Sequence, residues 1–187
     1  MESIKLQIQE LICKISSKKE PDYETLVKLI HILKNVDDVI NPKCKLGKLS
    51  NETNGFTQIN GEKIKGELAP LEDSITLLNI KNAQGKYVKI MKGVRKANTR
   101  VGIHVHKYGG YTIILKGEMT DYVQGLPVKK YKANSGYYMP PCTPMSASNE
   151  GPEDVELIDI FIGDPEKPYI QILEPGWKWS RYGVFDS

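Results

Sequence analysis

The chain has 187 residues, 40% of them hydrophobic, and a formal net charge of +3, which allows one domain with an appendage or two small domains. No apolar run approaches the ~18 residues of a transmembrane helix, and the first residues lack the apolar core of a signal peptide. Three widely spaced cysteines without a CxxC pair argue against a disulfide framework or a zinc ribbon. We therefore expect a cytoplasmic protein with no membrane segment.

Residues 1–47 are predicted to form a helical hairpin. Apolar side chains repeat at helical spacing in residues 4–15 and again in residues 26–36. Pro21 and Asp22 separate the two stretches, and Asp22 is a suitable N-cap for the second helix. Because two helices cannot bury both apolar stripes by themselves, we expect the hairpin to dock on the rest of the protein or to mediate a homodimer.

Residues 48–73 are predicted to be a linker, and residues 74–187 a β-barrel with a C-terminal tail. The linker is polar and contains several glycines. Short β-rich segments then follow one another, separated by Gly, Pro, Asn and Asp. They are Ile75–Ile80, Tyr87–Met91, Arg100–His106, Tyr111–Lys116, Thr120–Val123, Val128–Tyr131, Gly136–Met139 and Val155–Ile162. Many short strands without an intervening helical segment indicate an all-β sandwich or barrel.

Charge is distributed unevenly along the barrel region. Residues 74–117 carry nine Lys or Arg and no acid, whereas residues 118–187 carry eleven acids and six bases. The basic stretch either offers a face to an anionic ligand or forms a solvated set of strand faces that pairs with the acidic part. It lacks interleaved aromatic residues, except Tyr87, and has no nucleic-acid motif, so we favour the solvated face and expect no nucleic-acid partner.

Two of the three histidines, His104 and His106, lie in one predicted strand, and the third, His31, lies in the helical region. Side chains alternate along a strand, so both imidazoles of a His-x-His pair point to the same face. If the chain has metal chemistry, this pair is where we expect it. Zinc or iron usually needs at least three protein ligands, so a third ligand has to come from elsewhere.

The residues that follow this pair resemble the first motif of the cupins, which are jelly-roll β-barrels. That motif contains a His-x-His pair, then a glutamate and a glycine. Here His104 and His106 occupy the pair and Gly117 the closing glycine, while Gly110 or Tyr111 stands at the glutamate position. The local sequence around the paired glycines also resembles that of the cupins of zinc-binding anti-sigma factors.

A second stretch resembles the second cupin motif, which carries proline, glycine, histidine and asparagine at fixed spacing. In that frame Pro140 takes the proline, Cys142 the glycine, Met145 the histidine and Asn149 the asparagine. The resemblance covers residues 75–162 and implies a cupin-like jelly-roll β-barrel preceded by the helical hairpin. It also implies a ligand or metal site inside the barrel.

The ligand set that the resemblance implies is incomplete, because two histidines, a glutamate and a third histidine hold the metal in the family. The candidate metal ligands are His104 and His106, with zinc, iron or copper as the ion, and the barrel can also be metal-free. Met145 offers a thioether, which favours copper, Cys142 a thiolate and Tyr111 a phenolate. Together with Tyr138, these three residues are the predicted ligand pocket.

Three functions are compatible with this pattern. The first is a homodimeric cupin that binds a small molecule or a metal ion near the histidine pair. The second is a metal-dependent dioxygenase or related small-molecule enzyme, against which the missing glutamate and third histidine weigh. The third is a regulatory or sensor protein that acts through its N-terminal helices. No catalytic residue can be assigned from the sequence.

Overall fold

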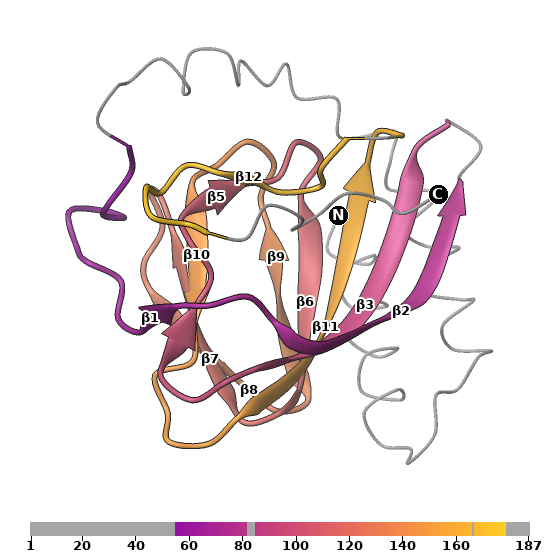
Figure 1. Ribbon diagram of the computed structural model, residues 1–187. Helices are drawn as coiled ribbons and strands as arrows, with labels where there is room; N and C mark the ends of the chain where they lie inside the picture. The colour runs from indigo at the N-terminus through magenta and orange to yellow at the C-terminus, as the bar shows by residue number, and fades with distance from the viewer. Residues whose placement is uncertain (1–54, 82–84, 166, 179–187) are drawn as a thin grey trace. The chain divides into compact units, whose positions relative to one another are not determined.

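The computed structural model describes residues 55–81, 85–165 and 167–178 (Figure 1). All of them belong to one compact unit, Pro42–Ser187. The helical hairpin predicted for residues 1–47 lies outside the described residues. Within the described part of the chain, no helix has the length and apolar character needed to span a membrane.

The described residues form twelve strands in two sheets. The strands are β1 (Glu67–Leu68), β2 (Glu72–Lys81), β3 (Tyr87–Arg95), β4 (Thr99–Arg100), β5 (His104–Val105), β6 (Gly110–Lys116), β7 (Glu118–Val123), β8 (Lys129–Lys132), β9 (Ser135–Met139), β10 (Met145–Ser148), β11 (Val155–Gly163) and β12 (Gln171–Ile172). Each of the eight predicted β segments has a counterpart among them.

The five-stranded sheet has the order β2-β3-β11-β6-β9, and all its pairs are antiparallel. Strand β11 is central and pairs with β3 along its full length. Side chains alternate between the two faces of β11. Leu157, Asp159 and Phe161 therefore point to one face of the sheet, toward the other sheet, and line the space between the two.

The seven-stranded sheet contains β1, β4, β10, β5 and β12, and β7 joins β10 on its other side and carries β8. Strand β10 pairs with β4 through Ser148 and Arg100, and with β5 through Met145 and His104. The single strand predicted for residues 100–106 is therefore divided in two. At the interruption, the Gly102 carbonyl accepts a hydrogen bond from the His104 side chain.

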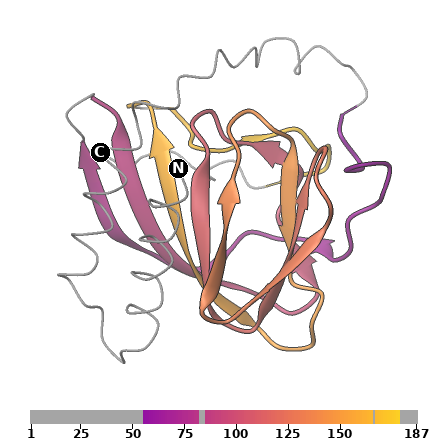
Figure 2. The same cartoon turned by 180° about the vertical axis from the view of Figure 1, so that it is seen from behind.

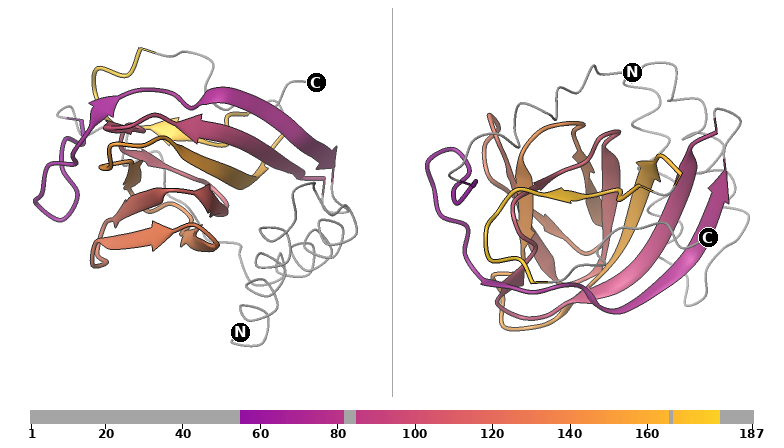
Figure 3. Two further views of the ribbon diagram at one scale, coloured as in Figure 1. Left: turned by 90° about the horizontal axis from the view of Figure 1, so that it is seen from below. Right: turned by 45° about the horizontal axis from the view of Figure 1, so that its top comes forward.

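The main hydrophobic core lies between the two sheets, which face each other in Figure 1 and in the reverse view of Figure 2. The chain segment that contains β12 crosses the upper end of the barrel (Figure 3, right). On the outer side of the seven-stranded sheet, Ile59 and Ile64 form a smaller cluster with Ile103 and Tyr122. Two facing, largely antiparallel sheets joined by long-range pairings form a cupin-like jelly roll, as the sequence predicted.

Candidate metal and ligand site in the barrel

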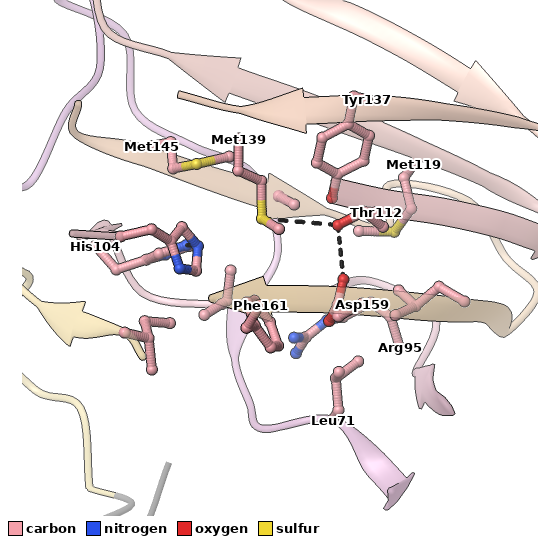
Figure 4. A pocket seen from close by; sticks show the side chains of 15 residues that line it. Leu71, Arg95, His104, Thr112, Met119, Tyr137, Met139, Met145, Asp159 and Phe161 are labelled. Atoms are coloured by element: carbon pink, nitrogen blue, oxygen red, sulfur yellow. Dashed lines mark hydrogen bonds between the residues drawn. The ribbon is translucent and has the colours of Figure 1, made fainter. Parts of the chain in front are cut away.

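A small cavity of about 40 Å³ lies between the two sheets. It is large enough for one ion or a very few water molecules, because one water needs roughly 10–15 Å³ of such space. Apolar side chains make up most of its wall. The polar residues that line it are His104, His106, Arg95, Thr112, Tyr137 and Asp159 (Figure 4).

The two histidines are held beside the region of the second motif. His104 lies opposite Met145 in the pairing of β5 with β10. His106 forms an isolated β-bridge with Pro141, and its carbonyl accepts a hydrogen bond of 2.7 Å from the Cys142 N–H. Backbone pairing thus brings together two stretches that are more than thirty residues apart in the sequence.

Hydrogen bonds fix the tautomer of both imidazoles. Nδ1 of His104 lies 2.7 Å from the Gly102 carbonyl oxygen, and Nδ1 of His106 lies 2.9 Å from the Tyr169 carbonyl oxygen. A carbonyl oxygen only accepts hydrogen bonds, so each Nδ1 carries a proton and donates it. In the neutral form each Nε2 then has a free lone pair, and the two Nε2 atoms are 3.0 Å apart.

Both imidazoles are neutral at physiological pH. His104 is 3% exposed and His106 is 1% exposed. Burial, then the neighbouring His106 and the charge of Arg95, lower the pKa of His104 well below its usual value. Burial likewise lowers the pKa of His106 to about 4, against the opposing effect of the Tyr169 carbonyl. Two lone pairs that face each other without a proton between them repel, and a bound cation removes that repulsion.

Aromatic rings hold the histidine pair in place. The His104 and His106 rings meet edge to face, with centroids 4.8 Å apart. The His106 ring stacks on Phe161 at 5.3 Å, and Phe161 stacks on Tyr169 at 4.1 Å. The Tyr169 carbonyl also accepts a hydrogen bond from Nδ1 of His106. Stacking and hydrogen bonding therefore both fix the orientation of the His106 ring.

Two thioethers line the same end of the cavity as His104. Figure 4 shows Met139 and Met145 at this end, whereas Met119 and Arg95 lie at the other. Among the described residues, no group of three or more His, Cys, Asp and Glu side chains is placed to hold a metal ion. Further ligands from the chain would therefore be thioethers, which suit copper(I) better than zinc or iron.

The other end of the cavity carries a buried carboxyl group. The Thr112 hydroxyl donates a hydrogen bond of 2.6 Å to Asp159, and its oxygen lies 3.8 Å from the Met139 sulfur (Figure 4). Burial raises the pKa of Asp159 to about 6, although Thr112 and the charge of Arg95 oppose this effect. Near neutral pH this carboxyl group changes its charge inside the barrel.

Arg95 places a permanent positive charge in the cavity wall. Its side chain is 3% exposed, and Nη1 donates to the carbonyls of Ala69 at 2.5 Å and Pro70 at 3.1 Å. Its Nε is buried without a hydrogen-bond partner among the described residues. The end of the cavity away from the histidines therefore presents a cation and an unsatisfied donor.

The structure separates the predicted site residues into two groups. His104, His106 and Met145 line the cavity. Tyr111 and Tyr138 do not line it: they lie opposite each other in the β6–β9 pair, with ring centroids 5.1 Å apart, and Tyr138 is 40% exposed. Burial raises the pKa of Tyr111, which disfavours a phenolate.

Cys142 is also absent from the cavity wall. It is half-buried after β9, in a left-handed conformation with φ 57°. Its sulfur lies 3.5 Å from the Lys107 carbonyl oxygen, outside the cavity wall. Its backbone N–H donates a hydrogen bond to the His106 carbonyl.

Several residues of the cavity have no counterpart in the sequence-based prediction, among them Arg95, Thr112 and Asp159. The sequence could have indicated Asp159, because it is the one acid at the inward positions of the strand Val155–Gly163, where the other inward residues are apolar or glycine. Thr112 and Arg95 carry no such signal. Their residue types are common on exposed strand faces.

No protein-family model matches the chain, and no curated protein matches it. Solved structures do. They include a conserved protein of Klebsiella pneumoniae with a double-stranded β-helix domain, at 19% identity and a TM-score of 0.40, covering 51% of this chain and 82% of that one. They also include an RmlC-like cupin of Methanocaldococcus jannaschii, at 22% identity and a TM-score of 0.41, covering 53% and 88%.

A third match is the DMSP lyase DddQ of Ruegeria pomeroyi, at 14% identity and a TM-score of 0.47. It covers 58% of this chain and 54% of the lyase. Cupin and double-stranded β-helix proteins are among the solved structures that resemble this chain. By the topology of its own two sheets, the described part of the chain is a cupin-like jelly-roll barrel.

Proposed function

We propose that this protein is a cupin-fold binding protein that holds a soft metal ion, copper(I), inside its barrel between His104 and His106. The observation that carries the proposal is the pair of Nε2 atoms, 3.0 Å apart, whose lone pairs are both free because both Nδ1 atoms donate to carbonyls. Two nitrogens at this separation can both bind one ion at the usual distance of about 2.0–2.1 Å.

The neighbouring groups support a soft ion. Met145 lies directly across from His104 in the strand pairing, and its side chain is 1% exposed. Its thioether and that of Met139 are the candidates for a third ligand, because both line the cavity at the end that holds His104 (Figure 4). When bound, a copper ion would supply a positive charge, and the chain would supply neutral, prearranged imidazoles in a buried cavity.

The size of the cavity favours binding over catalysis. A dioxygenase would need space for a substrate beside the ion, and pockets for drug-sized ligands measure about 300–1,000 Å³. The volume here is about 40 Å³. It accepts an ion and a water molecule, but no organic substrate of ordinary size.

The test is copper(I) titration of the untagged, full-length protein against a competing chromophoric chelator, with zinc and ferrous iron as parallel arms. We expect one equivalent of copper(I) to bind. Loss of either imidazole, in His104→Ala or His106→Ala, should weaken binding by more than the roughly 10–100-fold that loss of an outer-shell partner costs. Wild-type protein that takes up no copper(I), or alanine variants that bind it equally well, would contradict the proposal.

A second pair of variants tests the thioether without removing a histidine. Met145→Leu conserves volume and should leave the fold intact. It should weaken copper(I) binding and leave zinc binding unchanged, because only the soft ion prefers sulfur. Met119→Leu at the opposite end of the cavity is the matched control and should bind copper(I) as the wild type does (Figure 4).

The homodimer, the cytoplasmic location, the small-molecule partner and the sensor role through residues 1–47 stay predictions of the sequence.

A further inference from the structure

A second, larger pocket of about 220 Å³ is lined by residues at and beside the ends of β5, β11 and β12. Its apolar wall comes from Val105, Ile162 and Pro168. The volume is below the roughly 300–1,000 Å³ range of drug-sized ligands, which indicates a small metabolite. No residue is shared between this pocket and the cavity inside the barrel.

Positive charge dominates this pocket. Lys107 and Lys167 line it, and Asp164 is the one acid among the described residues of its wall. Lys86, which does not line the pocket, also pairs with Asp164, so two ammonium groups contact this carboxylate. Two of these lysines belong to the basic stretch of residues 74–117. The described residues of the wall, two lysines and one aspartate, therefore carry an excess of one positive charge.

The cations are held in place before any ligand arrives. Asp164 accepts hydrogen bonds from Lys86, from Lys107 at 2.6 Å and from the Tyr108 hydroxyl at 2.8 Å. Burial opposes ionisation of Asp164, but these hydrogen bonds outweigh it and hold the pKa of the carboxyl group well below its usual value. The Tyr108 ring lies under both ammonium groups, with Lys107 Nζ 4.9 Å from its centroid.

Donors remain for a ligand. An ammonium group has three N–H donors, and Lys107 gives one of them to Asp164. Among the described residues, no acid lies within ion-pair distance of Lys167, whose side chain is exposed at the rim. The Gln171 amide adds a neutral donor and acceptor to the wall.

We propose that this outer pocket binds a small organic anion, with a carboxylate or phosphate group held by Lys107 and Lys167 and the body of the molecule against Val105, Ile162 and Pro168. The anion replaces water at charges that Asp164 leaves unneutralised. Charge-assisted hydrogen bonds of this kind are shorter and stronger than neutral ones.

The test is calorimetric titration of the full-length protein with malonate and, separately, with inorganic phosphate at low ionic strength. We expect one saturable site for at least one of them, and the two arms tell carboxylate from phosphate recognition. Lys167→Met should weaken binding about tenfold or more, since one charge-assisted hydrogen bond is lost. Lys107→Met should do the same, and the thermal midpoint of Lys167→Met should match that of the wild type.

The control is Lys129→Met, which removes an equal charge from the exposed strand β8. Its affinity should equal that of the wild type. No saturable binding of either anion, or an equal loss in Lys129→Met, would overturn the proposal. The outcome is independent of the copper titration, because the two cavities have no lining residue in common.

Discussion

At the residue scale, a second buried carboxyl group makes stability depend on pH. Asp121 on β7 lies opposite Ala147, which lines the cavity, and is 6% exposed. Its Oδ1 has no hydrogen-bond partner among the described residues. Burial raises its pKa to about 7. The folded protein therefore binds this proton more tightly than the unfolded chain does, and this contribution to stability is lost as the pH rises from about 4 to about 7.

The variant Asp121→Asn tests this account, because the amide has the same shape and does not ionise. It should raise the free energy of unfolding, and the gain should be about 2 kcal/mol larger at pH 8 than at pH 5. Urea unfolding at the two pH values measures the difference. Asp154→Asn is the control, since its carboxylate is paired with Lys96 at 2.5 Å and should not gain stability on neutralisation. An equal gain at both pH values would refute the burial argument.

At the scale of elements, the pairing of β6 with β9 sets the position of Thr112 and Tyr137. A Cβ atom on Gly136 would lie 2.4 Å from the Thr112 carbonyl oxygen, a distance that the backbone cannot accept. The glycine thus allows the two strands to approach closely where Thr112 donates to Asp159.

We expect Gly136→Ala to lower the free energy of unfolding by about 2–3 kcal/mol, as overpacking does elsewhere. Chemical denaturation measures the loss. Gly151→Ala is the matched control, because its Cβ would meet only the Asn149 side chain, at 3.4 Å. Should both variants prove equally stable, the close approach of β9 to β6 would not be a constraint on the fold.

The strands also show how much of the fold can be predicted from the sequence. The β-rich segments and the glycine and proline positions between them predicted a strand for every long strand of both sheets. Strand β10, Met145–Ser148, was not predicted, because the sequence Met-Ser-Ala-Ser has low β propensity. It is a strand because neighbours pair with it on both sides, which is a long-range effect that a local pattern does not contain.

The difference between local pattern and long-range pairing also explains which predicted site residues line the cavity and which do not. The His-x-His spacing predicted that His104 and His106 share a face, because side chains alternate along a strand. The resemblance to the second cupin motif put Met145 beside them, and all three residues line the cavity. Tyr111 falls one position out of this period and points outward with Tyr138. Asp159 comes from a strand more than fifty residues away, and only the sheet pairing brings it to the same cavity.

At the scale of the whole described unit, one ion pair fastens the segment after β12 to the seven-stranded sheet. Arg100 donates two hydrogen bonds of 2.6 Å to the Glu174 carboxylate, which also accepts the Ile103 N–H at 2.8 Å. Both side chains are about nine-tenths buried. Bidentate, buried geometry of this kind makes loss of one partner costly.

Glu174→Gln should therefore lower the free energy of unfolding by about 3 kcal/mol, because it leaves the Arg100 charge buried without its partner. Thermal unfolding measures the change. Glu118→Gln is the control: its pairing with Lys130 at 3.3 Å is exposed and should contribute less than about 1 kcal/mol. Equal effects of the two substitutions would show that the segment after β12 does not brace the sheet.

The central claim is that both buried imidazoles are neutral and offer free Nε2 lone pairs to one soft ion. Long-range ¹H–¹⁵N NMR of the histidine side chains reports the protonation of each ring nitrogen directly. At pH 7 without metal, we expect a protonated Nδ1 and a bare Nε2 on both His104 and His106, and one equivalent of copper(I) should shift the two Nε2 signals. A proton shared between the two Nε2 atoms, or Nε2 signals that do not move with copper(I), would contradict the account.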